Sequence, residues 1–301
     1  MTFNFGSIAG ETAKVAPPAP GPSARALMEE VPKAERQALL VGQPNVGKSV
    51  VFGALTGTYV TVSNYPGTTV EVTRGRAKFG DRVWEVIDTP GTHNLVPMSE
   101  DEAVTRDILL STRHDAVVQV GDAKNLVRTL LLTLQIAELG IPFCLDLNML
   151  DEARARGVSV DLEGLARELP GITINASTAT EGEGLDAVRA YLAAHAAGLP
   201  AEGGARRPLP CAPSFAGDIE EAIAEIESHL DPSLPVCRRA VATMLLAGDR
   251  GVGASLASVA RVSDEAVRVA KARALSIARG QGVPVFALLS RLRLVRAQAI
   301  V

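Results

Sequence analysis

A glycine-rich octapeptide, GQPNVGKS, constrains this chain more than any other stretch of its sequence. It follows the apolar run ALLV, and its spacing, Gly42-x-x-x-x-Gly47-Lys48-Ser49, is that of a phosphate-binding loop between a buried strand and a helix. In such a loop the backbone N–H groups bind phosphate oxygens, the lysine reaches the outer phosphates and the serine ligates Mg²⁺. We therefore predict a nucleotide site whose loop consists of Gly42, Gln43, Pro44, Asn45, Val46, Gly47, Lys48, Ser49 and Val50.

Short apolar runs recur along the chain and alternate with helical patterns. Their continuous hydrophobicity is typical of strands that are buried on both faces of a parallel sheet. Helical connections, such as residues 126–139, predict right-handed crossovers between these strands. The sequence thus predicts a doubly wound, mostly parallel α/β domain over residues 38–197. The runs are ALLV before Gly42, WEVID from Trp84, AVVQV from Ala116, PFCLDL from Pro142 and ITI from Ile172.

Two stretches rich in proline, glycine and alanine divide the chain. Residues 1–37 predict a flexible N-terminal arm or a cloning remnant, because VAPPAPGPSARA cannot sustain a periodic apolar face. Residues 198–213 predict a linker. Beyond the linker the strand pattern disappears, and residues 214–301 are predicted to form a small all-α helical domain. One helical stripe of that domain consists of Ile219, Ile223, Ile226 and Leu230.

Charge and composition argue against several classes of protein. The formal net charge of −4 disfavours a chain whose main task is to neutralise nucleic-acid phosphates. The three cysteines have no CxxC spacing, so neither a disulfide framework nor a zinc site is indicated. No run reaches the roughly 18 apolar residues of a membrane span, and the N-terminus lacks the pattern of a secretory signal. As given, the chain is expected to be soluble and cytoplasmic.

The tetrapeptide Asp88-Thr89-Pro90-Gly91 ends the WEVID strand downstream of the phosphate loop. At this place an aspartate can hold Mg²⁺ through water, and the Gly91 N–H can contact the γ-phosphate of a nucleoside triphosphate. A lone DxxG is common, but its order and position here predict a GTPase.

A second segment, Asn148-Met149-Leu150-Asp151, ends the PFCLDL strand and predicts guanine recognition. A carboxylate at Asp151 can accept hydrogen bonds from the ring N–H and the exocyclic amine of guanine, whereas adenine offers no such pair of donors. After the last predicted strand, the turn TATEG at Thr178 and Ala179 can bring a backbone N–H to the guanine carbonyl. The base site is therefore predicted to include Asn148, Met149, Asp151, Thr178 and Ala179.

Taken together, these segments closely resemble the cytosolic N-terminal region of the bacterial ferrous-iron transporter B (FeoB) family. The consecutive motifs are GQPNVGKS, VSNYPGTTVE, DTPGTHNL, DAKNLVRTLLLTLQIAELGIP and LNMLDEA, with RRAVATMLLAGD in the helical part. The resemblance covers nearly everything from Ala38 to the end. It implies a Ras-like P-loop GTPase domain followed by a helical module, with GTP or GDP and Mg²⁺ as ligands.

The resemblance also implies roles for switch I and for a K⁺ site. Thr69 matches the switch I threonine that closes on Mg²⁺ and the γ-phosphate, which makes Ser49, Thr69 and Asp88 the implied Mg²⁺ residues. Asn45 matches the asparagine that helps to hold K⁺ in potassium-activated GTPases, with backbone carbonyls around Ser63 and Tyr65 completing that site. Such a cation stabilises charge on the transferring phosphoryl group, as an arginine finger does. The implied catalytic residues are Lys48, Thr69, Gly91 and Asn45.

Several residues depart from common GTPase patterns. Thr92 stands where Ras-like proteins carry a water-positioning glutamine, so slow intrinsic turnover is expected. His93 is a tempting base, although a packing or exposed role is the favoured interpretation. Met149 replaces the usual lysine of NKxD, which predicts weaker guanine binding and faster release. Val50 and Gly53 depart from the polar pattern that normally follows the loop serine. This departure is expected to affect the affinity for the nucleotide rather than the identity of the nucleotide.

The leading hypothesis is a GTP-hydrolysing regulatory module of a bacterial ferrous-iron transporter, at the cytoplasmic face of the inner membrane. The segment RLRLVRAQAIV ends where a membrane segment is expected, so a transmembrane iron-permeation domain outside this sequence is the implied partner. A homo-oligomer is left open, and no nucleic acid is expected. One alternative is a soluble ribosome-assembly or RNA-modification GTPase of the potassium-dependent class, which shares the GxPNxGKS loop. Another is a nucleotide-binding switch with negligible hydrolysis.

Overall fold

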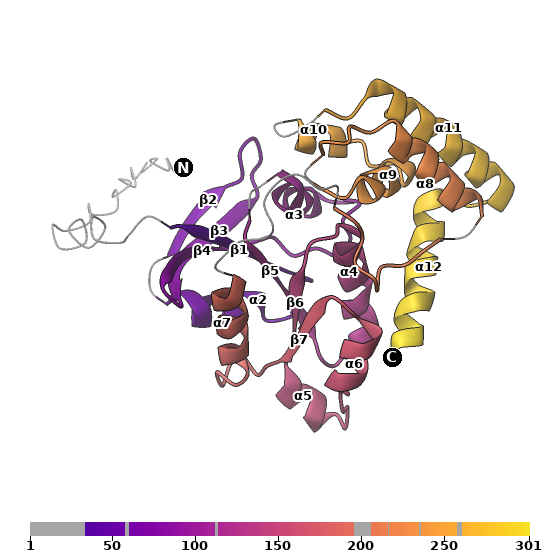
Figure 1. Cartoon of the computed structure of the whole chain (residues 1–301). Helices are drawn as coiled ribbons and strands as arrows, with labels where there is room; N and C mark the ends of the chain where they lie inside the picture. Colours follow the sequence, from indigo (N-terminus) through magenta and orange to yellow (C-terminus); the bar gives the residue numbers. More distant parts are fainter. Residues whose placement is uncertain are drawn as a thin grey trace, which may run out of the picture. The chain divides into compact units, whose positions relative to one another are not determined.

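A computed structural model describes residues 34–57, 60–111, 114–195, 206–215, 217–234, 236–257 and 261–301. Residues 34–301 form one compact unit (Figure 1). The predicted arm lies outside the described residues except for its last four positions, and the predicted linker falls partly outside them. The first strand begins at Arg36, so the end of the predicted arm already belongs to the sheet.

A seven-stranded sheet, in the order β2-β3-β4-β1-β5-β6-β7, forms the centre of the fold. β1 pairs in parallel with β4 and β5, and β5, β6 and β7 continue the parallel part. β3 pairs antiparallel with both β2 and β4. The mostly parallel sheet confirms the predicted fold class. The strands are β1 (Arg36–Gly42), β2 (Val60–Asn64), β3 (Glu71–Phe79), β4 (Arg82–Asp88), β5 (Ala116–Asp122), β6 (Phe143–Asn148) and β7 (Ile172–Ala176).

The sequence pattern did not reveal β2 and β3. All five residues of β2 are exposed, and Val60 and Val62 alternate with polar residues, so this edge strand has no continuous apolar run. In β3, the buried residues Val72, Gly75 and Phe79 are separated by exposed or half-buried residues, most of them polar, in an antiparallel hairpin. The predictions were based on continuous apolar runs, which mark only strands that are buried on both faces.

The two faces of the sheet carry separate apolar cores. Along β1, Leu39 and Val41 face one core, whereas Ala38 and Leu40 face the other, because side chains alternate along a strand. The first face is covered by α3 (Glu100–Ser111), α4 (Leu126–Glu138) and α6 (Leu162–Glu168). The second is covered by α2 (Lys48–Thr56) and α7 (Leu185–Ala194), as Figure 1 shows. The chain also contains α5 (Leu150–Ala155).

The C-terminal part is helical, as predicted, and packs against the first face of the sheet domain. Its elements are α8 (Asp218–Ser228), α9 (Arg238–Leu246), α10 (Val252–Leu256), α11 (Asp264–Gln281) and α12 (Val285–Ile300). Arg293 on α12 forms two hydrogen bonds of 2.7 Å with the Glu138 carboxylate on α4, and both side chains are buried. Arg106 on α3 pairs with the buried Asp249. Buried ion pairs require their partners, so these contacts tie the helical part to α3 and α4.

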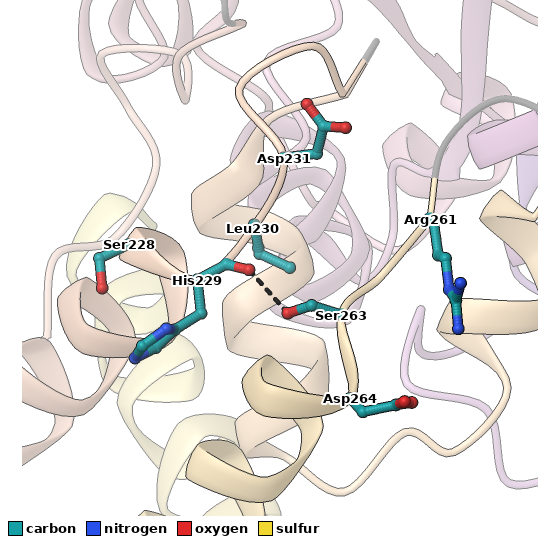
Figure 2. Close-up of a pocket in the computed structure, with 7 residues that line it drawn as sticks. All are labelled: Ser228, His229, Leu230, Asp231, Arg261, Ser263 and Asp264. Carbon is teal, nitrogen blue, oxygen red and sulfur yellow. Dashed lines mark hydrogen bonds between the residues drawn. The ribbon is translucent and has the colours of Figure 1, made fainter.

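Figure 2 shows an open hollow in the helical part, between the end of α8 and the start of α11. Ser263 donates a hydrogen bond of 2.8 Å to the His229 carbonyl and accepts one from the Ala266 N–H, which caps α11. The charged groups of Asp231, Arg261 and Asp264 point in different directions in this view. The hollow thus lies at the junction of α8 and α11. Within the described ranges, the helices are all too short or too polar to cross a membrane.

Candidate functional site

The phosphate loop joins β1 to α2, as its sequence predicts. Gly47 has a φ of +80°, and a Cβ there would lie 2.3 Å from Asn148 Nδ2. A Cβ on Gly42 would lie 2.5 Å from the Val120 carbonyl oxygen. Both positions therefore require glycine. No side chain caps the start of α2, so its first N–H groups remain available to an anion.

The lysine and serine of the loop meet the aspartate that ends β4. Lys48 Nζ donates to the Asp88 carboxylate and to the Thr89 carbonyl, and Ser49 Oγ donates to Asp88 Oδ2 at 3.0 Å. The parallel register that pairs Leu40 with Asp88 brings these segments to one edge of the sheet. A hydroxyl and a carboxylate are hard oxygen ligands that suit Mg²⁺, which normally takes its remaining ligands from phosphate and water.

The DTPG loop lies directly on the phosphate loop. The Thr92 N–H donates to the Gly42 carbonyl at 3.0 Å. A Cβ on Gly91 would lie 2.8 Å from Pro44 Cγ, so only glycine permits this approach. Gly91 is thereby held beside the phosphate loop, where the sequence predicts its N–H to act.

Asn148 links the guanine motif to two other loops. Its Nδ2 donates to the Val46 carbonyl at 3.1 Å, and its Oδ1 accepts from the Ala179 N–H at 3.0 Å. The amide that the sequence assigns to base recognition therefore connects the phosphate loop with the turn at Thr178. Asp151 lies exposed in the first turn of α5, with a carboxylate that is free to accept from a ligand. The Thr178 hydroxyl is buried and has no hydrogen-bond partner among the described residues.

Met149 adopts a left-handed backbone conformation, with a φ of 63°. Its methyl carbon lies 3.6 Å from the position that a Cβ would take on Gly47, so this side chain reaches the phosphate loop. The thioether brings an apolar surface to the place where an NKxD protein has an ammonium group.

The switch I residues are not brought to the other site residues. Ser63 is exposed in β2 and pairs with Val72 across the hairpin. The Tyr65 carbonyl accepts hydrogen bonds from the Thr68 N–H and hydroxyl, both at 3.0 Å. Thr69 is exposed and makes no hydrogen bond through its side chain to any described residue. Asn45 is exposed and has a φ of 64°. The predicted roles of these four residues stay predictions.

The sequence model of the family described as "Ferrous iron transport protein B" matches residues 36–192. The chain belongs to this family. It is 36% identical over 217 residues, 70% of its length, to the Fe(2+) transport protein A/Fe(2+) transporter FeoB fusion protein of Porphyromonas gingivalis. It is also 42% identical over 130 residues, 43% of its length, to the Fe(2+) transporter FeoB of Staphylococcus aureus strain COL. These matches span 25% and 19% of the relatives' own lengths, so the matched segments correspond to about a fifth to a quarter of those proteins.

Solved structures of FeoB cytosolic regions share the fold. A mutant of S. thermophilus NFeoB bound to mGDP matches with a TM-score of 0.74 and 29% identity, covering 88% of this chain and 97% of that one. The cytosolic domain of L. pneumophila FeoB matches with a TM-score of 0.72 and 27% identity over the same shares. FeoB membership decides against the ribosome-assembly alternative. The likeness extends through the helical part, because it covers most of the chain.

Glu102, at the start of α3, was not singled out from the sequence. Its carboxylate accepts hydrogen bonds from the backbone N–H groups of His93, Asn94 and Met98, at 2.9 to 3.3 Å. It therefore holds the loop that follows DTPG in this FeoB-family chain. The cluster of acidic residues at a helix start was the available signal, since carboxylates there bind free N–H groups.

The structure shows what Thr92 and His93 contact, the two residues after Gly91 that were noted among the departures from common GTPase patterns. Thr92 is fully buried, and its hydroxyl donates to the Asn94 carbonyl at 2.8 Å. The His93 ring lies 3.4 Å from a guanidinium nitrogen of Arg128, near the surface. The hydroxyl of Thr92 thus stabilises its own loop, and the His93 ring contacts the Arg128 guanidinium near the surface.

Asp146 is a second group that the sequence did not reveal. It lies in β6, two residues before Asn148, and is fully buried. Its carboxylate accepts hydrogen bonds from Asn175 Nδ2 at 2.7 Å and from Ser177 Oγ at 2.9 Å. Burial raises the pKa of Asp146 to about 6, although these hydrogen bonds offset part of the effect. Asp146 therefore joins the guanine-motif strand to β7 and to the start of the TATEG turn.

Proposed function

We propose that this chain binds guanine nucleotides and hydrolyses GTP, as the regulatory G-protein part of a ferrous-iron transporter. The observation that carries the proposal is Asn148, whose amide bonds to both the phosphate loop and the Thr178 turn. A single residue thus couples the base-reading segment to the phosphate-reading segment. The mGDP in the S. thermophilus NFeoB structure supports a guanine nucleotide as the ligand.

The described residues can perform the steps that hydrolysis needs. Lys48 and the N–H groups at the start of α2 neutralise the phosphates, and Ser49 and Asp88 would hold Mg²⁺ together with Thr69 once switch I has closed. Bound Mg²⁺ supplies positive charge at the phosphates. The Gly91 N–H, held beside Pro44, would respond to a γ-phosphate. Because the Thr92 hydroxyl is already used within its loop, no side chain at that position orients water, and we expect slow turnover.

Base selection rests on Asp151 and Asn148. An exposed carboxylate at Asp151 accepts two hydrogen bonds from guanine, and adenine cannot supply them. One N–H of Asn148 remains beyond its bond to Val46 and can serve an acceptor on the base. GTP is therefore expected to bind far more tightly than ATP.

A K⁺ ion is the proposed additional cofactor. Asn45 stands at the start of the phosphate loop, and carbonyls near Ser63 and Tyr65 would reach the ion only after β2 and the following turn rearrange. K⁺ binding would therefore accompany closure of switch I. This predicts faster turnover in K⁺ than in Na⁺.

Iron transport belongs to the whole transporter, of which this chain spans a minor part. We propose that the missing part is the transmembrane iron-permeation domain, and that the helical part carries the nucleotide state toward it. The buried pairs Arg106–Asp249 and Arg293–Glu138 support this route, because they attach the helical part to α3 and α4. α3 is the first helix after the DTPG loop.

Calorimetry with GDP, GTP and ATP in Mg²⁺ tests nucleotide selectivity. Equal affinity for GTP and ATP would overturn the proposal. Steady-state hydrolysis in K⁺ and in Na⁺ then tests the cation. Asn45→Gly is a suitable variant for this test. Glycine tolerates the positive φ at this position, and the substitution removes the side-chain amide. Loss of K⁺ stimulation with unchanged GDP affinity is expected; K⁺ stimulation that survives Asn45→Gly would exclude this ion site.

A further inference from the structure

Lys124 brings a positive charge to the guanine motif from a neighbouring strand. Its Nζ lies 3.1 Å from Met149 Sδ and 2.8 Å from Glu152 Oε2. The side chain is only 12% exposed. Met149 in turn reaches the phosphate loop at Gly47. The ammonium group is therefore separated from the loop by a single thioether.

The sheet topology explains this placement. β5 and β6 are parallel neighbours, and their register pairs Asp122 with Asn148. Residues that follow the two strands consequently emerge at the same edge of the sheet. The Asp122 carboxylate accepts a hydrogen bond of 2.9 Å from the Lys124 N–H, which fixes the turn and directs the lysine toward the guanine motif.

The guanine motif carries negative charges that a nearby cation offsets. Asp151 and Glu152 both lie in the first turn of α5, and Met149 contributes no charge. The phosphates of a bound nucleotide would add negative charges at the adjoining phosphate loop. The ammonium of Lys124 opposes these carboxylates, with Asp122 3.7 Å away as a further acidic neighbour.

We propose that Lys124 is a nucleotide-affinity residue, which supplies from the end of β5 the positive charge that Met149 does not supply within the guanine motif. The inference rests on the proposed nucleotide site and deepens it. Met149 stands where NKxD proteins have a lysine, and this difference by itself predicts weak guanine binding and fast release. Lys124 restores part of the lost attraction, and it acts on affinity rather than on the hydrolysis step.

A purely structural role for Lys124 makes a different prediction. If its only task were to hold α5 through Glu152, removing either partner of the ion pair would disturb the site in the same direction. If Lys124 attracts the nucleotide, removing Glu152 frees the ammonium and removes one competing carboxylate. Variants of the two partners then change affinity in opposite directions.

The test uses Lys124→Met, with Lys124→Arg as the charge-retaining control and Glu152→Gln as the partner variant. The Kd and the dissociation rate of GDP are measured at low salt and at about 0.5 M salt, where charge interactions are screened. We expect Lys124→Met to raise the Kd about three- to tenfold at low salt, mainly through faster dissociation. Lys124→Arg should remain within about twofold of the parent protein, and Glu152→Gln should tighten binding.

Three results would overturn the inference. These are an unchanged Kd in Lys124→Met, an equal weakening in Lys124→Met and Glu152→Gln, and a loss of affinity in Lys124→Met that high salt does not reduce. A parent chain that fails to bind GDP would instead contradict the proposed function itself, so the two failures are distinguishable. Far-UV circular dichroism of each variant shows whether the fold is retained.

Discussion

The nucleotide site has two halves with different structural support. At the base and phosphate half, Asn148, Lys48 and Asp88 are held by hydrogen bonds that link three loops. At the switch I half, β2 is an exposed edge strand and Thr69 faces solvent. The first half is held by contacts within the chain, whereas the second is expected to rearrange if its residues are to reach a nucleotide. A molecule that signals by nucleotide state needs both, because the fixed half provides affinity and the movable half provides the response.

The largest effect is expected at the point where the fixed half is most crowded. Gly47→Ala places a methyl group 2.3 Å from Asn148 Nδ2 at a φ of +80°, so either the loop or Asn148 must move. We expect GDP affinity to fall by about 100-fold or more, which is close to 3 kcal/mol. Calorimetry measures the change.

Gly53→Ala is the matched control for that substitution. A Cβ on Gly53 meets no atom within 4 Å, and this glycine lies within helix α2. Nucleotide affinity should remain unchanged, while the free energy of unfolding should increase by about 0.5–1 kcal/mol. Similar affinity losses in both variants would contradict the preformed geometry of the loop.

Asp146 makes the fixed half sensitive to pH. Its pKa in the folded protein is about 6, above the ordinary value of 3.8, so the folded state binds the proton more tightly than the unfolded chain does. The free energy of unfolding should therefore decrease as the pH rises from about 4 to about 6, by up to about 3 kcal/mol. Asp146→Asn should remove this slope in urea titrations across that range.

Asp186→Asn is the control for the pH experiment, because the Asp186 side chain is almost fully exposed. This variant should retain the slope of the parent protein. If Asp146→Asn also retained it, the burial of Asp146 would not be the source of the pH dependence.

Thr69→Ala tests the movable half. Since Thr69 makes no side-chain hydrogen bond to the described residues and is exposed, GDP affinity should change by less than about twofold. The kcat of GTP hydrolysis should fall by about tenfold or more, because Thr69 is expected to reach Mg²⁺ only in the triphosphate state. A large loss of GDP affinity would show that switch I already contributes to the fixed half.

The smallest effect is expected in β2. Val62 is 58% exposed, so Val62→Thr should change the free energy of unfolding by less than about 0.5 kcal/mol. The same substitution at the fully buried Val118 in β5 should cost about 1–3 kcal/mol, since it buries a hydroxyl. Equal costs at the two positions, measured in urea, would mean that β2 is packed against another surface in solution.

Predictions from sequence succeeded where a motif requires particular residues at fixed spacing and where a strand contains an apolar run. The loop from Gly42 to Val50 requires particular residues at fixed spacing, and the strands β1, β4, β5, β6 and β7 show as apolar runs. β2 and β3 escaped because an exposed hairpin has no continuous apolar signal. The sequence did not single out Glu102 and Asp146. The contacts that make them important are with backbone N–H groups or with residues that are distant in the sequence.

The sequence by itself determined the fold class and the family, and it predicted the chemistry of the nucleotide site, since glycine, lysine, serine and carboxylate motifs act through short-range geometry. Only the tertiary structure decided that Asn148 joins three loops and that Lys124 reaches Met149. The physical reason is the register of parallel strands, which brings the ends of β5 and β6 to one edge of the sheet. Such proximity depends on the whole sheet, so no single motif encodes it.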